Sequence, residues 1–138
     1  MLKPGRAWQG NVGASAEALS KLRAASHLPL PGKLYEFLAF SDGGEGPLPL
    51  NPFYFILTSA AVIADNLNSH VFEEFFRGFL IFGSNGGGEY IALDVRGDPP
   101  WPVVALDMTN IDIAESLMPL APSFDEFVTL VGVEATDA

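Results

Sequence analysis

A cluster of glycines, Gly83 and Gly86–Gly88, directly follows the apolar residues 79–82. Glycine loops behind a buried strand are typical of phosphate sites, where backbone N–H groups bind the anion. The phosphate loop of nucleoside triphosphatases also needs a lysine, and no lysine follows Gly83. The dinucleotide spacing G-x-G-x-x-G is missing too, and the alternating residues 89–95 predict a strand where that motif has a helix. The sequence therefore argues against a phosphate site here.

A hairpin turn explains the same residues better. Asn85-Gly86 is a strong signal for a two-residue turn, because asparagine and glycine both tolerate positive φ. The additional glycines would permit a bulge or a close backbone approach. We therefore expect residues 79–82 and 89–95 to form two strands of one hairpin. Ser84 has Phe82 where a nucleophile elbow needs glycine, so this turn is not a catalytic elbow.

Two carboxylates, Asp94 and Asp107, lie near the ends of adjacent predicted strands and could therefore lie close together. Paired carboxylates shift each other's pKa or hold a divalent metal ion. Acids at strand ends are more often simply solvated, so we predict no catalytic residue and no metal site. His27 and His70 lack the i, i+4 partner of a helical metal site, and we expect both at the surface or its boundary. Trp101 is expected in the core, the alternative being a loop that presents it to a partner.

Composition predicts one globular domain. The chain has 138 residues, of which 49% are hydrophobic, and it has no cysteine. Thiol catalysis, thiolate metal sites and disulfides are thereby excluded. The N-terminus has no secretory signal, and prolines interrupt the longest uncharged run well short of a membrane span. We expect a cytoplasmic protein with no cofactor, no contact with a membrane and an oligomeric state that the sequence does not reveal.

Charge is distributed very unevenly along the chain. Residues 1–33 contain five basic groups and one acid, whereas residues 34–138 contain sixteen acids and only Arg77 and Arg96. The second segment therefore carries a net charge of −14. Such a field repels nucleic acid and anionic lipid and accelerates encounter with a basic protein. The alternative is that the acids only keep an apolar protein soluble.

Hydrophobic periodicity places helices at both ends of the chain. One is expected over residues 14–25 with Ser15 as its N-cap, and a second runs from about Pro31 to Asp42. A last helix begins at the capping box of residues 123–126 and ends at Gly132. Between them we expect a loop over 45–52, strands over 53–57 and 102–108, and a helix over 60–67. Residues 68–78 suit a helix or a partly buried loop, with the helix favoured, and residues 110–120 are ambiguous.

These elements predict a single α+β domain with a mainly antiparallel, curved sheet flanked by the N-terminal helices and the C-terminal helix. We expect a lead-in over residues 1–13, the domain over 14–133 and a short tail over 134–138.

Four segments taken in order resemble the SUKH superfamily, which includes the fungal cell-wall assembly regulator domain and many bacterial immunity proteins. They are LPGKLYEFL at residues 30–38, SDGG at 41–44, FGSNGGGE with ALD at 82–94, and LAPSFDEF at 120–127. The fold that this resemblance implies is the same α+β domain. Residues 68–79 are richer in phenylalanine than the family leads us to expect, which would suit a larger core or an oligomer surface.

The resemblance implies binding to a protein, not catalysis. It favours an immunity protein that neutralises a polymorphic toxin by direct contact, for example a basic nuclease, and the acidic charge would complement such a partner. The alternative is a housekeeping regulator or scaffold, as in cell-wall assembly. The acids expected to contact the partner lie on the sheet and its loops: Asp42, Glu45, Glu89, Asp94, Asp98 and Asp107.

Overall fold

The computed structural model describes residues 1–109 and 112–136 of the chain. The helices are α1 (Ala16–Ala25), α2 (Gly32–Phe40), α3 (Ala60–Ser69), α4 (Ile113–Ser116) and α5 (Phe124–Val128). The strands are β1 (Gln9–Gly10), β2 (Gly44–Pro47), β3 (Tyr54–Leu57), β4 (Phe79–Ser84), β5 (Glu89–Asp94), β6 (Val103–Asp107) and β7 (Met118–Ala121).

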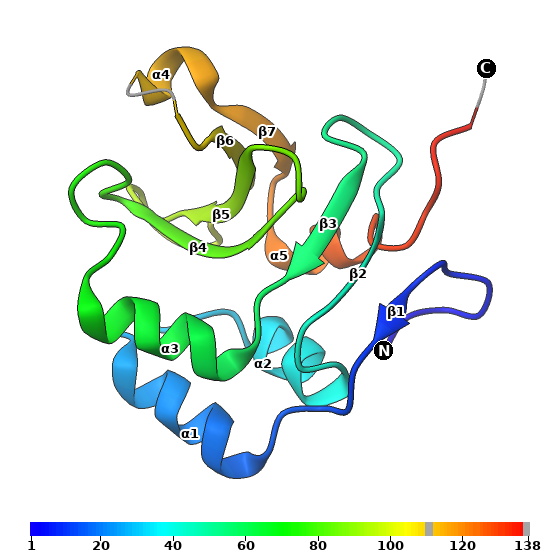
Figure 1. The fold of residues 1–138 in the computed structure, drawn as a ribbon, viewed down its shortest axis with the longest axis horizontal. Helices are drawn as coiled ribbons and strands as arrows, with labels where there is room; N and C mark the ends of the chain where they lie inside the picture. The colour runs from blue at the N-terminus through cyan, green and yellow to red at the C-terminus, as the bar shows by residue number, and fades with distance from the viewer. Residues whose placement is uncertain (110–111, 137–138) are drawn as a thin grey trace.

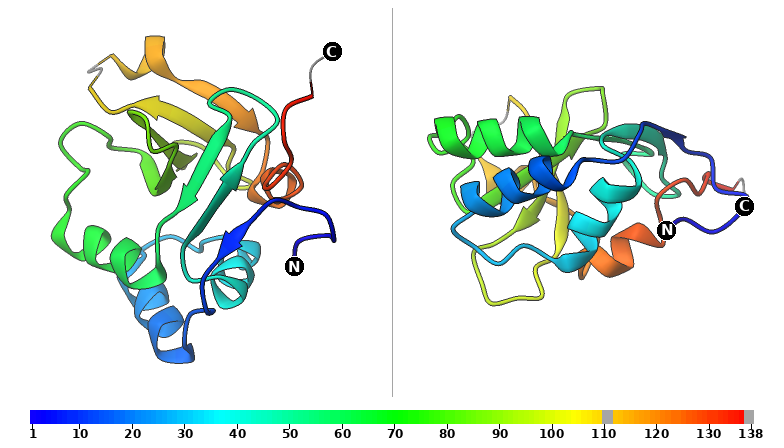
Figure 2. Two further views of the ribbon diagram at one scale, coloured as in Figure 1. Left: turned by 45° about the vertical axis from the view of Figure 1, so that its right-hand side comes forward. Right: turned by 90° about the horizontal axis from the view of Figure 1, so that it is seen from below.

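The seven strands form one sheet in chain order, and every neighbouring pair is antiparallel. The sheet bends so that β1–β3 turn away from β4–β7, while α1, α2 and α3 gather at one end of it (Figures 1 and 2). Helix α4 lies at the opposite end, beside β6 and β7 (Figure 1). The predicted α+β class, with an antiparallel sheet and helices near both termini, is confirmed.

Serine side chains cap three of the helices, and the caps of α1 and α5 are the ones that the sequence predicts. Ser15 accepts a hydrogen bond from the Ala18 backbone N–H at 3.1 Å, and Ser59 caps α3 in the same way. Ser123 accepts from the Glu126 N–H at 3.1 Å, which is the serine half of the predicted capping box. Each bond satisfies one of the backbone donors that the first helical turn leaves without a partner.

The middle of the chain differs from expectation in two places. Part of the expected loop over 45–52 is strand β2, because glycines there let the backbone lie against β1 and β3. The helix favoured over 68–78 is wrong: α3 ends at Ser69, its C-cap His70 has a left-handed backbone with φ of 55°, and turns follow. The ambiguous stretch after Met108 holds α4 and the start of β7, and its residues 110–111 lie outside the described ranges. The expected lead-in contributes β1, and residues 137–138 of the expected tail are not described.

The glycine cluster forms the predicted hairpin between β4 and β5, but through a longer turn. Positive φ falls on Gly86 (75°) and Gly88 (116°), not on Asn85. The Asn85 side chain instead accepts hydrogen bonds from the backbone N–H groups of Gly87 at 2.9 Å and Glu89 at 3.0 Å. The Asn-Gly pair therefore closes a four-residue loop through the asparagine side chain.

Both faces of the sheet are covered by apolar side chains. The larger core lies between the sheet and helices α1, α2, α3 and α5. The opposite face carries a second, smaller cluster that includes Phe76, Phe79, Ile81, Val104 and Leu106. The phenylalanine-rich segment after α3 supplies Phe72 and Phe76 to it, and both rings lie within 5.3 Å of the Tyr90 ring. The excess of phenylalanine is therefore explained by a larger core, although Phe75 is exposed.

Gly83 is the glycine of the hairpin that the packing requires. A Cβ atom built there would lie 2.5 Å from the Ile56 carbonyl oxygen and 2.6 Å from the Phe55 ring. We expect Gly83→Ala to lower the free energy of unfolding by about 2 kcal/mol, because β3 must shift to make room. Gly87→Ala is the control, since its Cβ would have no neighbour nearer than 3.6 Å. Urea denaturation measures both, and equal stabilities would contradict the packing argument.

Candidate functional site

The six predicted acids do not form one patch, because the hairpin topology separates them. Strands β5 and β6 run antiparallel, with Glu89 directly opposite Asp107. Asp94 lies at the other end of β5, where its backbone N–H bonds the Pro102 carbonyl at 2.9 Å. The expected proximity of Asp94 and Asp107 is therefore wrong: each ends its strand, and antiparallel neighbours end at opposite edges of a sheet.

Glu89 and Asp107 are the acidic pair that the structure does bring together. Both side chains belong to the strand positions that face the larger core, at the edge where β5 begins and β6 ends. Asn85 donates to the Glu89 carboxylate at 3.3 Å, and Thr109 donates to the Asp107 carboxylate through its backbone N–H at 2.8 Å and its hydroxyl at 2.9 Å. Helix α4 contacts β6 and carries two further acids, Asp112 and Glu115, while its Ile113 and Leu117 pack against the smaller cluster on the opposite face of the sheet. We call Glu89 and Asp107 the acidic edge.

Asp94 is paired within the chain. Two hydrogen bonds of 2.8 Å join its carboxylate to the Arg96 guanidinium, and only 15% of the Asp94 side chain is exposed. These bonds lower the pKa of the Asp94 carboxyl below its usual value, against the opposing effect of burial. Arg96 also lies over the Phe79 ring, 4.8 Å from its centre. Asp94 thus helps to hold the start of β4 against the end of β5.

Asp42 and Glu45 line an open, polar groove between β1, β2 and the start of α3. One Asp42 oxygen accepts a hydrogen bond of 2.8 Å from the Ala60 backbone N–H, so this carboxylate supports the first turn of α3. Glu45 pairs with Ile56 across β2 and β3 and lies near Tyr54. Burial and then the Glu45 carboxylate raise the pKa of the Tyr54 phenol.

The loop between β5 and β6 carries the remaining predicted residues. Asp98 is exposed at its tip. Trp101 is buried, with 4% of its surface exposed, and its indole N–H donates to the Gly97 carbonyl at 2.8 Å. The core position expected for Trp101 is confirmed, and its indole holds this loop in place.

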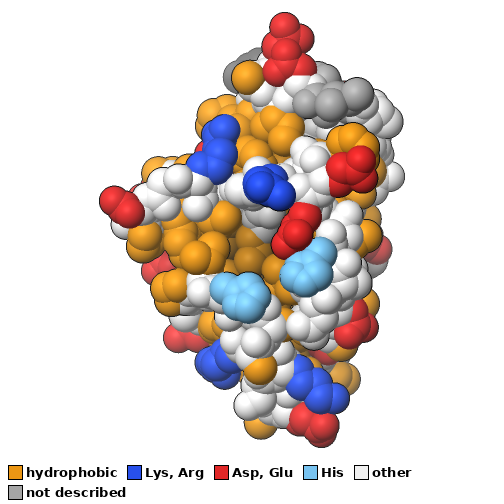
Figure 3. Space-filling model, turned by 90° about the vertical axis from the view of Figure 1, so that its left-hand side faces the viewer, with side chains coloured by type: hydrophobic (Ala, Val, Ile, Leu, Met, Phe, Trp, Pro, Cys, Tyr) orange, Lys and Arg blue, Asp and Glu red, His pale blue; other side chains and the backbone are white. Residues whose placement is uncertain are grey.

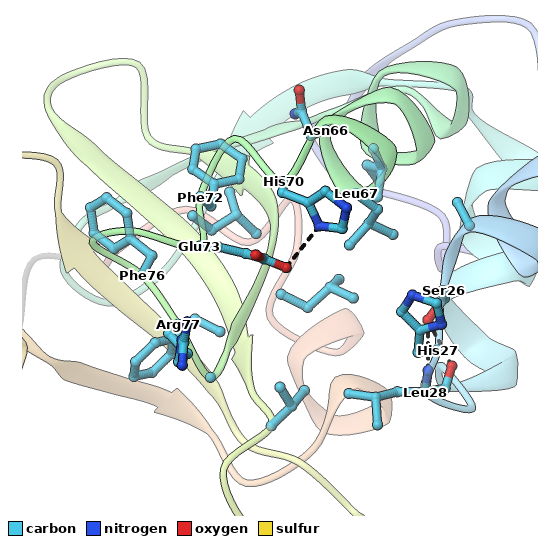
Figure 4. A pocket seen from close by; sticks show the side chains of 17 residues that line it. Ser26, His27, Leu28, Asn66, Leu67, His70, Phe72, Glu73, Phe76 and Arg77 are labelled. Atoms are coloured by element: carbon cyan, nitrogen blue, oxygen red, sulfur yellow. Dashed lines mark hydrogen bonds and ion pairs between the residues drawn. The ribbon is translucent and has the colours of Figure 1, made fainter.

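An apolar hollow that the sequence does not predict lies at the helical end of the sheet (Figure 3). Its wall comes from the end of α1, the second half of α3, residues 72–79 and the first residues of β4. His27 and His70 are exposed, as expected, but both line this hollow from opposite sides (Figure 4). The signal in the sequence was the phenylalanine-rich segment after α3, although nothing local connects it with His27.

A comparison with known protein families identifies the family of this chain. Residues 13–130 match the family model described as the SMI1 / KNR4 family (SUKH-1). The chain belongs to this family. No curated protein gives a significant match to the chain.

The SUKH-1 match extends over α1 to α5 and leaves out β1. In this chain β1 is nevertheless fixed to the matched region. The Ala7 N–H bonds the Gly132 carbonyl at 2.9 Å, and the Trp8 ring packs edge-on against Phe37 at 5.3 Å. The N-terminal strand is therefore part of the folded domain of this SUKH-1 protein.

Residues 1–109 and 112–136 contain no group of three or more acidic or histidine side chains arranged to hold a metal ion. None of the helices in those ranges has the length and apolar character needed to cross a lipid bilayer.

Pairing with Arg96 makes Asp94 a source of acid sensitivity. Its folded pKa is lowered, so the ionised carboxylate stabilises the folded state above its unfolded pKa, about 3.9, and this contribution is lost as pH falls through the folded value. We expect Asp94→Asn to lower the free energy of unfolding at pH 7 by about 1 kcal/mol, a modest figure because Arg96 is half exposed.

Urea denaturation between pH 7 and pH 2 measures this effect. The Asp94→Asn variant should lose less stability than the wild type over the acidic part of that range. Asp98→Asn, which removes an exposed loop acid, is the control and should follow the wild type. Parallel pH profiles for Asp94→Asn and the wild type would contradict the assignment.

Proposed function

We propose that this SUKH-1 protein is a non-enzymatic cytoplasmic binding protein that neutralises a basic protein toxin, such as a nuclease, by direct contact. Membership of the family supports a binding role, since the SUKH group includes immunity proteins. The observation that carries the choice of a basic partner is the charge of residues 34–138, sixteen acids against two arginines.

The acidic edge is the surface that suits this partner best. Residues 78–95 and 97–138 contain no lysine or arginine, so β5 and β6 supply the acids of this edge, and α4 beside β6 carries further acids, without any basic residue of their own. Asp94 is a poorer contact, because Arg96 already neutralises it. An arrangement of this kind accelerates association with a positively charged protein through long-range attraction.

Charge reversal at the edge tests the role of these acids. We expect the double variant Glu89→Lys with Asp107→Lys to slow association with the toxin by about tenfold or more and to flatten the dependence of that rate on salt. The control is Glu17→Lys with Asp65→Lys, which reverses two exposed acids on α1 and α3 at the other end of the domain. Surface plasmon resonance at several salt concentrations measures both, and equal rates for the two doubles would remove the edge from the interface.

The function itself is tested by expressing the chain together with the toxin encoded next to its gene. We expect co-purification of the two proteins and rescue of growth. Absence of both a complex and rescue would contradict the proposal for that pair. A housekeeping regulator, which the same family match supports, predicts instead a complex with a cellular protein and no rescue.

A further inference from the structure

The apolar hollow beside α3 has the construction of a small binding site. Its volume is about 270 Å³, just below the range typical of small-molecule sites. Four separate parts of the chain form its wall, and its apolar residues include Ile63, Leu67, Phe76, Leu80, Ile81 and Val95. Ile63, Phe76, Leu80 and Ile81 are each less than 8% exposed, so the hollow is a recess with a buried floor, not a flat apolar surface.

The rim of the hollow carries the few groups that could bind a polar end of a ligand. Arg77 lines it from the segment before β4, and His27 lines it from the end of α1 (Figure 4). Around the recess, Figure 3 shows basic side chains and both histidines on the same face of the molecule. Residues 34–138 contain sixteen acids and only two cations, Arg77 and Arg96. A basic side chain at the rim of the hollow is therefore unusual for this part of the chain.

Of the two arginines in residues 34–138, Arg77 is the one that forms no ion pair within the described residues. Arg96 is paired with Asp94, and Glu73 on the rim is paired with His70 through a contact of 2.8 Å. Within residues 1–109 and 112–136, the Arg77 side chain forms no ion pair or hydrogen bond, and it is exposed. A guanidinium at the mouth of an apolar recess complements a ligand with an apolar body and one anionic group.

We propose that this hollow binds a small amphipathic carboxylate, such as a medium-chain fatty acid, with its apolar chain in the recess and its carboxylate on Arg77. The recess removes the chain from water, and the guanidinium supplies two parallel N–H donors to the two carboxylate oxygens. The Glu73 carboxylate faces the same mouth, and its contact with His70 turns it away from the Arg77 side (Figure 4). This site lies at the opposite end of the sheet from the acidic edge, so it does not depend on the proposed partner.

The probe is sodium octanoate, titrated below its micelle concentration into the ¹⁵N-labelled full chain and followed by NMR. 1-Octanol and octylammonium are the matched ligands, with the same chain but no charge or the opposite charge. We expect saturable octanoate binding with shifts centred on the amides of Ile63, Leu67, Leu80 and Val95. Octanoate should bind more tightly than octanol, and octylammonium most weakly.

The variant that decides the role of the cation is Arg77→Gln. It should weaken octanoate binding by about tenfold or more and leave octanol binding unchanged. Lys3→Gln removes the same charge outside the hollow and should change neither affinity. A thermal melt of each variant confirms folding, which is expected because both side chains are exposed.

Four results would overturn the proposal. They are the absence of saturable binding, shifts centred elsewhere, equal affinities for octanoate and octanol, and unchanged octanoate binding by Arg77→Gln. Sedimentation equilibrium supplies a separate check. A dimer whose interface shifts map to the same amides would make a second copy of the chain the occupant of the hollow, and would also overturn it.

Discussion

Five phenylalanine rings from four elements pack together at the centre of the domain, mostly edge to face, and the contact between the sheet and helices α2 and α5 depends on them. Phe55 on β3 lies 5.0 Å from Phe127 on α5 and 5.8 Å from Phe82 on β4, measured between ring centres. Phe124 joins Phe82 at 5.4 Å and Phe37 on α2 at 6.5 Å. All five side chains are almost completely buried. Because large rings tolerate little displacement in a close-packed core, this cluster fixes the distance between the sheet and the two helices.

The same cluster explains why glycine is needed in the hairpin. Phe55 occupies the space in which a side chain at position 83 would lie, so close packing of the rings restricts the strand beside it to glycine. The irregular register between Ile81 and Gly83 then lets β4 continue to a loop beyond the core. The glycines that resemble a phosphate loop in the sequence are therefore consequences of aromatic packing and of hairpin closure.

The sequence predicted correctly those elements that depend on interactions between residues close together in the chain. Serine caps, the period-2 pattern of residues 89–95 and the apolar face of α5 each act within a few residues, and each element begins close to where it is expected. The end of the last helix was wrong: α5 ends at Val128, and turns, not helix, lead to Gly132. Strand β2 was missed because its glycines and proline carry no strand signal, and it exists through pairing with β1 and β3. The positions of the candidate site residues also depend on strand pairing, which the sequence does not show. Sequence placed Asp94 and Asp107 at strand ends, but only the antiparallel pairing shows that they lie at opposite edges.

The topology also separates the acidic edge from Arg77 in a strongly acidic domain. The acidic edge lies where β5 begins and β6 ends, whereas Arg77 and Arg96 lie at the start of β4 and the end of β5. At physiological salt the field of exposed charges decays over about 8 Å, which is less than the length of a six-residue strand, about 20 Å. An anionic group at the hollow is therefore governed by Arg77, His27 and Glu73 more than by the net charge. One small sheet can in this way attract a cation at one end and hold an anion at the other.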